Sequence, residues 1–249
     1  MYKSFYNALF DFLNFHSIKY TVQSNLVRFD DYDFSLYLIL ESDESSYTDF
    51  INKRAEEQDN HESYLIFIWF DLWANKPNII LSKLTHLLGL STKLHARKTK
   101  VELVSKSDCE AFFLANHLNQ PVIGYKRIGL SIQNELVALA SFAKRRKFRD
   151  GSYSAELLQF STINNHHING GLSKIIKHFT KSHPIDSLMT YIDLDWSTGD
   201  KFEKIGFEIE SQRHFVYFEL EPQNNQRRVT SNTNAPIFNT GSQKALIYF

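Results

Sequence analysis

The sequence predicts a mixed α/β (α+β) protein with two domains: a mixed sheet flanked by helices, and a smaller αβ domain that precedes it. Three observations lead to this class. Stretches with strand-like alternation are interleaved with stretches of helical periodicity. The content of 43% hydrophobic and 14% aromatic residues predicts well-filled cores. A polar and basic segment, residues 91–100, divides the chain and predicts domains at 1–92 and 93–249.

The first domain is expected to pack helices on a sheet. Pro77 and Gly89 bound a helix over 77–89, since proline favours helix starts and glycine favours helix ends. Apolar residues at helical spacing predict one face of an opening helix, formed by Phe5, Leu9, Phe12 and Leu13. Strands are predicted at 18–23, 34–41 and 63–70, and a polar helix at 45–58.

The second domain begins with a strong helix signal. Ser107 and Glu110 form a Ser-x-x-Glu capping box before residues 111–118. Residues 127–133 and 135–143 alternate on either side of a polar turn, which predicts a β-hairpin. The remaining elements are expected in this order: a strand at 155–162, a glycine turn with a helix at 168–179, a strand at 187–194, a short helix at 199–207, one or two strands at 207–220, an irregular polar tract at 221–236 and a hairpin-like pattern at 237–249.

Composition narrows the function classes. The formal net charge is +0, so any nucleic-acid-binding surface must be a local patch. One cysteine, Cys109, excludes an internal disulfide framework and a cysteine-rich zinc site, and it fits a reducing cytosol. No apolar run is long enough to span a bilayer, so we expect a cytoplasmic protein without a membrane partner. The adjacent His166 and His167 lack a carboxylate at ligand spacing, so no metal site is expected.

Two adjacent glycines, Gly170 and Gly171, stand directly before an amphipathic run in INGGLSKIIKHF. Leu172, Ile175, Ile176 and Phe179 form its core-facing stripe. The free N–H groups at such a helix start, together with the helix dipole, attract phosphate. A tight strand-to-helix connection without a ligand explains the two glycines equally well.

The order strand, glycine turn, helix, strand and short helix ending in Ile-Gly-Phe resembles the GNAT acyltransferases. In that family the turn Arg/Gln-x-x-Gly-x-Gly/Ala binds the pyrophosphate of acetyl-CoA. His167, Gly170 and Leu172 take its first, fourth and sixth positions, and His167 and Leu172 depart from the pattern. The resemblance implies acetyl-CoA or a related acyl-CoA as cofactor. The residues implied to hold it are Phe160, Ser161, Asn169, Gly170, Gly171, Leu172, Ser173 and Lys174.

A second resemblance covers residues 93–249. KLHARKTKVELV, INGGLSKIIKHF and YIDLDWSTGDKFEKIGF are similar, in content and order, to phage and mobile-element proteins with a GNAT-like domain of Mom type. Mom-type proteins modify adenine in DNA, which implies a nucleic acid, DNA above all, as partner. Members often carry an N-terminal domain similar to very-short-patch-repair endonucleases. This implies an endonuclease-like fold of the restriction-endonuclease type for residues 1–92.

Acyl transfer to nitrogen needs a deprotonated amine and a proton for the leaving thiolate. In many GNAT enzymes a tyrosine supplies that proton, and the matching residue here is Phe202, which cannot. The catalytic candidates are Asp193 at a strand end, Glu156 as general base, Ser197 and His117. For Ser197, Glu156 and His117 a plainer interpretation exists. Ser197 or Asp195 can be a helix N-cap. Glu156 can be a solvated charge at a strand end, and His117 can be a hydrogen-bonded structural residue.

A run of basic side chains ends one predicted strand. Its five members are Lys144, Arg145, Arg146, Lys147 and Arg149. They suit phosphate contacts, with Phe148 available to stack on a base, or else an ordinary solvated hairpin end. Arg227 and Arg228 are expected to extend the same surface.

A nuclease of the implied type needs an Asp and a Glu-x-Lys for its metal. Asp33 and Glu41 flank a strand, but Asp43 follows where lysine is required, so the domain is interpreted as degenerate. Three functions stay open: an N-acyltransferase acting on a nucleic-acid base, a non-catalytic GNAT-like binding module, and a metal-dependent endonuclease.

Overall fold

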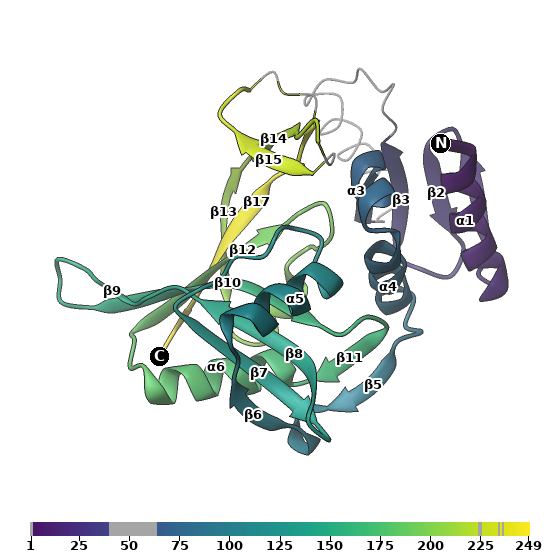
Figure 1. Cartoon of the computed structure of the whole chain (residues 1–249). Coiled ribbons are helices and arrows are strands. Elements are labelled where there is room, and N and C mark those ends of the chain that lie inside the picture. Colours follow the sequence, from purple (N-terminus) through teal and green to yellow (C-terminus); the bar gives the residue numbers. More distant parts are fainter. Residues whose placement is uncertain (1, 40–63, 224–225, 234, 236) are drawn as a thin grey trace. The chain divides into compact units, whose positions relative to one another are not determined.

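The computed structural model describes residues 2–39, 64–223, 226–233, 235 and 237–249 (Figure 1). The helix expected at 45–58 and the acidic residues Glu41 and Asp43 lie outside the described residues. Packing divides the chain into two compact units, and each is described by itself. Unit 1 comprises 1–77, 192–200 and 211–243, and unit 2 comprises 78–191, 201–210 and 244–249. The domain boundary after residue 92 stays a prediction.

Unit 1 contains a four-stranded sheet in the order β1-β2-β3-β4, formed by Tyr20–Gln23, Leu26–Phe29, Phe34–Ile39 and Tyr64–Trp69. β1, β2 and β3 pair antiparallel, whereas β3 and β4 pair parallel. Both parallel strands are almost wholly buried, as their continuous apolar sequences predict. Helix α1 (Tyr2–Phe15) buries Phe5, Leu9 and Leu13, and α3 (Phe70–Asn75) follows β4 directly.

Two sequence predictions near the end of the chain are wrong. The tract expected to be irregular contains β15 (Arg227–Thr230), which pairs with β14 (Tyr217–Leu220). The hairpin expected at 237–249 does not form, because its two halves join different sheets. β16 (Ile237–Phe238) pairs with β14, whereas β17 (Ser242–Tyr248) belongs to the largest sheet.

The largest sheet has the order β13-β17-β12-β10-β8-β7-β6. These strands are Glu208–His214, Ser242–Tyr248, Ser187–Asp193, Tyr153–Thr162, Glu135–Phe142, Lys126–Ile132 and Lys100–Leu103, and β9 (Arg146–Lys147) pairs with β10. β6, β7, β8 and β10 pair antiparallel, and β10 pairs parallel with β12. The predicted hairpin of β7 and β8 is confirmed, with Gln133 and Asn134 at positive φ in its turn. The chain is a mixed α/β protein, and its largest sheet has both parallel and antiparallel strands.

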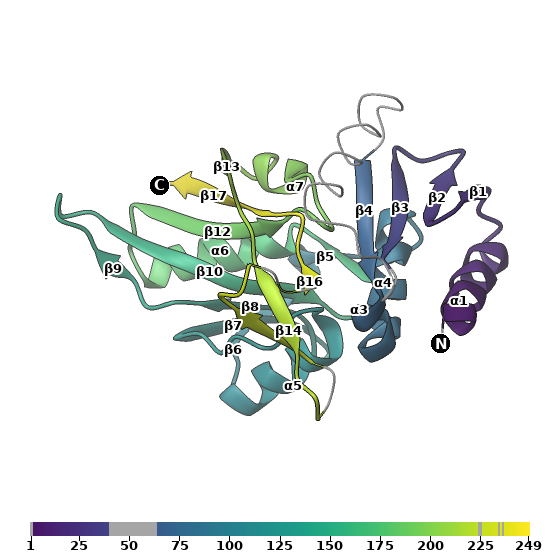
Figure 2. The same cartoon turned by 90° about the horizontal axis from the view of Figure 1, so that it is seen from above.

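Two helices cover opposite faces of β8 (Figure 2). Leu139 packs in a core cluster with Phe112 and Phe113 of α5 (Lys106–Asn116). Phe142 instead stacks on Phe179 of α6 (Gly171–Ser182), with ring centroids 4.1 Å apart. Because side chains alternate along a strand, residues 139 and 142 point to opposite faces.

The start of α5 differs from the expected one. Its N-cap is Ser105, whose side chain accepts from the Asp108 N–H at 3.1 Å, and not Ser107. The backbone of Ser105 is extended, as an N-cap requires, and Asp108 takes the third helical position.

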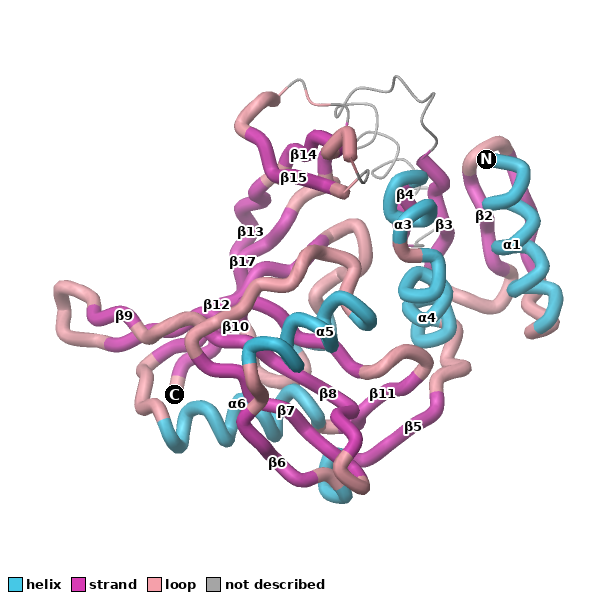
Figure 3. The backbone as a smooth tube through the Cα atoms, viewed as in Figure 1, coloured by secondary structure: helices cyan, strands magenta, loops and turns pink. Residues whose placement is uncertain are grey.

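Residues 91–100 form ordered structure. β5 (Thr92–His95) pairs parallel with β11 (His166–Asn169), and Figure 3 shows the two strands next to each other. The 3-10 turn η1 (Ala96–Lys98) follows β5. Helix α4 (Pro77–Leu87) ends before Gly89, which has φ 73° as a helix-ending glycine does. Among the described helices none is both long and apolar enough to cross a membrane.

Candidate functional site

The two parallel strands of unit 2 part soon after they start. β10 pairs with β12 only through Ser154 to Glu156, opposite Ser187 to Met189, although β10 continues to Thr162. Where the pairing stops, the Thr190 hydroxyl donates to the Leu157 carbonyl at 2.9 Å. The pairing of β10 with β8 shifts register between Leu157 and Gln159, which marks a bulge at the same place. The side of β10 that faces β12 is therefore opened from residue 157 onward.

The glycine turn leads from β11 into α6. Gly170 is the N-cap in the left-handed conformation (φ 74°, ψ 11°) and contributes no side-chain hydrogen bond. The first helical bond from this turn joins the Lys174 N–H to the Gly170 carbonyl at 3.0 Å. Within the described residues no acceptor meets the N–H groups of Gly171, Leu172 or Ser173. The helix thus offers three unpaired donors and the positive end of its dipole.

Lys174 forms one wall of this turn. Its ammonium donates to the Ala96 carbonyl at 2.8 Å and to the carbonyl and hydroxyl of Thr99 at 2.6 and 3.2 Å. These bonds use all three of its hydrogens and hold η1 against the helix start. The Lys174 ammonium therefore has no hydrogen left to donate to another group at the helix start.

A cluster of nitrogen groups lies beside β11. The Lys201 Nζ of α7 (Asp200–Glu203) is 2.5 Å from His86 Nε2, and the rings of His86 and His167 are 4.7 Å apart. Burial, then Lys201, His167 and Lys83, lower the pKa of His86 to about 4. Burial first and then Lys201 also lower the pKa of His167. The lowered pKa values keep both imidazoles neutral, because burial and neighbouring positive charge disfavour protonation and no nearby anion among the described residues compensates.

Glu156 is the last residue of β10 to pair with β12, so it stands at the parting point. It is half-buried, and burial raises the pKa of its carboxyl group. No hydrogen bond or ion pair of its side chain occurs within the described residues.

Gln159 and Ser161 lie opposite Ser141 and Leu139, which places both on the face covered by α5. Ala143 N–H donates to the Glu156 carbonyl, which extends this register and places Glu156 on the same face.

His117 ends α5 near the bulge. Its Nδ1 accepts from the Asn119 N–H at 3.1 Å and lies 3.5 Å from the Gln159 amide. The Ser161 hydroxyl donates to the Asn116 carbonyl, and Gln159 Nε2 donates to Gln120. The structure therefore brings His117, Gln159 and Ser161 together, and Nδ1 of the histidine is occupied by the backbone. Phe160, opposite Ala140, points to the other face.

Asp193 and Ser197 belong to unit 1. The Asp193 carboxylate accepts from the Asp195 N–H at 3.1 Å, and the Ser197 hydroxyl accepts from the Gly199 N–H at 3.1 Å. Asp195, expected as an N-cap, is instead a buried carboxylate that is 2% exposed. It accepts from Thr240 N and Oγ1 at 2.7 and 2.6 Å and from Trp69 Nε1 at 3.1 Å. Burial first and then Asp193 raise its pKa to about 7.

The basic run lies at the hairpin of β9 and β10, and its five side chains are exposed. Arg145 is partly engaged, since it donates to the Pro184 carbonyl at 3.0 Å and its guanidinium lies 4.4 Å from the Tyr153 ring. Arg227, expected to extend this surface, is instead bonded to the buried Asp71 at 2.6 and 2.8 Å. Arg228 pairs with Glu219 at 3.1 Å.

Two other chemistries find little support in the described part of the chain. No group of three His, Cys, Asp or Glu side chains there is placed to hold a metal ion, and Asp33 of the expected nuclease motif is exposed. Cys109 is buried, and burial raises the pKa of its thiol to about 11, so it remains protonated.

Sequence comparison finds neither a matching family model nor a matching curated protein. Solved structures of similar shape include Arabidopsis thaliana Naa50 with the bisubstrate analogue CoA-Ac-MVNAL, with TM-score 0.42, 9% identity and coverage of 61% of this chain and 99% of that one. A Bacillus subtilis acetyltransferase in complex with CoA matches with TM-score 0.38 and 13% identity, over 61% of this chain and 99% of that one. A GNAT family acetyltransferase from Elizabethkingia anophelis with acetyl-CoA bound matches with TM-score 0.38 and 12% identity, over 61% of this chain and 99% of that one. At these values the likeness concerns shape alone.

Several residues of the site were not found from the sequence. Gln159 and Thr190 acquire their roles only where β10 bulges and separates from β12. His86 and Lys201 meet across 115 residues of chain. A polar residue inside an apolar strand was the available signal for the first two, and the sequence carries no local signal for the second pair.

Proposed function

We propose that unit 2 is an N-acyltransferase that uses acetyl-CoA or a related acyl-CoA. The observation that supports this most strongly is the conjunction of two features: β10 and β12 part beyond Glu156, and α6 starts with three unpaired N–H groups. The opening between the two strands has room for an extended pantetheine arm, and the unpaired N–H groups at the helix start can donate hydrogen bonds to its diphosphate.

The residues around the turn fit such a cofactor. The N–H groups of Gly171, Leu172 and Ser173 would hold the diphosphate, and the Lys201 ammonium, beside His86 and His167, supplies nearby positive charge. Gly170 is exposed and carries no side chain that would cover these amides. The cofactor supplies an activated acyl group as a thioester.

Glu156 is the proposed general base. A half-buried carboxyl group with a raised pKa accepts a proton from an incoming ammonium or amine more readily than a solvated carboxylate. The amine nitrogen then forms the new C–N bond while the C–S bond breaks. Glu156 takes the proton of the amine. Phe202 occupies the position of the usual acid, so the leaving thiolate takes its proton from water.

The proposed acceptor is an amino group of a nucleic-acid base. The Mom-type resemblance motivates this, and the exposed basic side chains at the β9–β10 hairpin suit a phosphate backbone. The second candidate is a non-catalytic module of the same fold. The observation that favours it is the loss of a side-chain acid at Phe202.

Incubation with isotope-labelled acetyl-CoA and single-stranded DNA, followed by digestion and mass spectrometry of nucleosides, tests the proposal. We expect a labelled acyl-nucleoside that is lost with Glu156→Gln and retained with Glu135→Gln, an exposed acid of β8. Acetyl-CoA binding without any labelled nucleoside, over a range of DNA and RNA substrates, would favour the non-catalytic module.

A further inference from the structure

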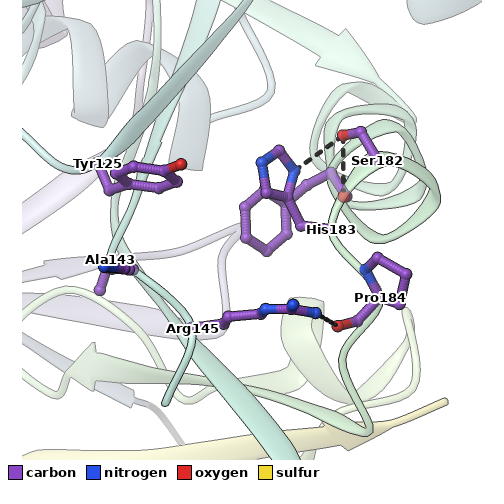
Figure 4. Close-up of a pocket in the computed structure, with 8 residues that line it drawn as sticks. Tyr125, Ala143, Arg145, Ser182, His183 and Pro184 are labelled. Carbon is purple, nitrogen blue, oxygen red and sulfur yellow. Dashed lines mark hydrogen bonds between the residues drawn. The ribbon is translucent and has the colours of Figure 1, made fainter. Parts of the chain in front are cut away.

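A second site lies at the opposite end of α6 from the glycine turn. A pocket of about 310 Å³ is lined by Tyr125, Ala143, Lys144, Arg145, Phe179, Ser182, His183 and Pro184. Figure 4 shows Tyr125 and His183 on opposite sides of it, with Arg145 below them. Gly171 and Ser182 are about 16 Å apart along the helix at 1.5 Å per residue. A ligand here does not overlap a diphosphate at the helix start.

The pocket combines fixed positive charge with aromatic surface. Arg145 is held in place by the Pro184 carbonyl and the Tyr153 ring, and Lys144 beside it is exposed. Lys126 lies 5.2 Å from the Tyr125 ring. No acidic side chain lines the pocket. The neighbouring Asp186 carboxylate is engaged by the Tyr153 N–H at 2.7 Å.

An aromatic stack forms one wall. The Phe142 ring stacks on Phe179, and Phe179 stacks on His183 with centroids 5.1 Å apart and planes within 10°. The Tyr125 ring meets His183 edge-on at 6.2 Å and is 52% exposed. A planar ligand ring therefore finds a rigid surface and an accessible tyrosine face.

The negative end of the α6 dipole lies close by and opposes an anion. The carbonyls of His178 and Phe179, however, are already bonded. The Ser182 hydroxyl donates to the His178 and Phe179 carbonyls, and the His183 N–H also donates to Phe179. The cations of the hairpin outweigh the remaining half charge.

We infer that this pocket binds one nucleotide unit, with its phosphate on Lys144 and Arg145 and its base against Tyr125. A volume of about 310 Å³ lies at the lower limit of ligand pockets, which suits a single small unit. The adjoining exposed residues Arg146, Lys147 and Phe148 continue the same chemistry and favour a strand as the source of the nucleotide. The inference deepens the nucleic-acid part of the proposed function by giving the strand a docking point outside the acyl-transfer site.

Fluorescence anisotropy with labelled ten-nucleotide oligo-dT, competed by AMP or by inorganic phosphate, tests the inference on the full chain. Tyr125→Ala is expected to weaken binding about 5- to 100-fold through lost stacking. Arg145→Gln should flatten the slope of log K against log salt by about 0.7, the value for one lost phosphate contact. Lys177→Gln removes the same charge from an exposed position of α6 outside the pocket. It should change the affinity for the oligonucleotide less than twofold and should leave the salt slope as in the wild type.

Equal losses for Lys177→Gln and Arg145→Gln, or unchanged binding in Tyr125→Ala, would overturn the pocket as the site. Competition by phosphate as strong as that by AMP would also overturn it, because a base contact would then contribute nothing. If only AMP binds, the nucleotide is a free one and the strand is excluded. Ser173→Glu, at the start of α6, separates the two proposals. Oligonucleotide binding that survives this change while acyl transfer is lost supports both proposals. Oligonucleotide binding by a wild-type protein that transfers no acyl group supports the pocket and counts against the transferase.

Discussion

The Thr190 hydroxyl donates a hydrogen bond to the Leu157 carbonyl at the point where β10 and β12 separate. Thr190 is 5% exposed, so this bond satisfies a buried carbonyl that would otherwise have no partner from the neighbouring strand. A single side chain thus closes the end of the parallel ladder and permits the opening beyond it. The opening is the feature on which the proposed cofactor site depends.

Thr190→Val should destabilise the protein. Valine has nearly the same shape but leaves the Leu157 carbonyl unpaired, which costs about 1–3 kcal/mol in the free energy of unfolding. Urea denaturation measures this change. Thr180→Val, at a solvent-accessible helix position, is the matched control and should cost a few tenths of a kcal/mol, about the difference in surface propensity. Equal stability of the Thr190 and Thr180 variants would show that the bond does not hold the opening.

Glu156→Gln should lower kcat about 10²- to 10⁴-fold and leave the Kd for acetyl-CoA unchanged. The base acts in its deprotonated form, and burial raises its pKa above the usual value of 4.5. Wild-type activity should therefore rise with pH through this raised pKa and fall in acid. A pH–rate profile with kcat/KM measures it. Loss of cofactor binding in the variant would instead assign Glu156 to the binding surface.

Lys201→Ala should raise the pKa of His86 from about 4. Lys201 is the second cause of the depression after burial, so the new value should stay below 6.5. Titration of the imidazole signals by NMR follows this directly. Lys83→Ala, the weakest of the named causes, should produce a smaller rise. A larger shift with Lys83→Ala would contradict the close contact of Lys201 and His86.

Asp195 should make unit 1 less stable as pH rises. Its folded pKa of about 7 lies above the usual 3.8, so the folded state retains a proton that the unfolded state releases. The free energy of unfolding should fall between about pH 4 and pH 7 for this reason. Asp195→Asn should remove that slope. The variant is also less stable at every pH, because the asparagine NH₂ group faces the hydrogen-bond donors of Trp69 and Thr240. Asp11→Asn, at an exposed site of α1, should retain the wild-type slope.

Local patterns predicted most elements whose stabilisation is local. The stripe of Ile175, Ile176 and Phe179 is buried as its spacing indicated, and the polar turn of the β7–β8 hairpin has the expected positive φ values. The start of α5 was misplaced by two residues, since Ser105 and Ser107 both suit an N-cap and the backbone conformation decides between them.

Elements stabilised by distant partners were not predictable. β15 forms where Arg227 meets Asp71, 156 residues earlier in the sequence, and its own sequence is polar. In the same way, the glycine turn was evident from the sequence, whereas the parting of β10 and β12 and the meeting of His86 with Lys201 depend on strand register and chain crossings.

Calorimetric titration with acetyl-CoA tests the central claim, that the bare amides at the start of α6 bind a diphosphate. Ser173→Glu places a carboxylate over these amides and should stabilise the helix by about 0.3–1 kcal/mol, so lost binding cannot be ascribed to unfolding. Thr180→Glu adds the same charge about 10 Å further along the helix and is the control. We expect saturable heat at one site per chain for wild type and Thr180→Glu, and none for Ser173→Glu. Equal binding by all three proteins, or no heat from wild type at millimolar acetyl-CoA, would contradict the account.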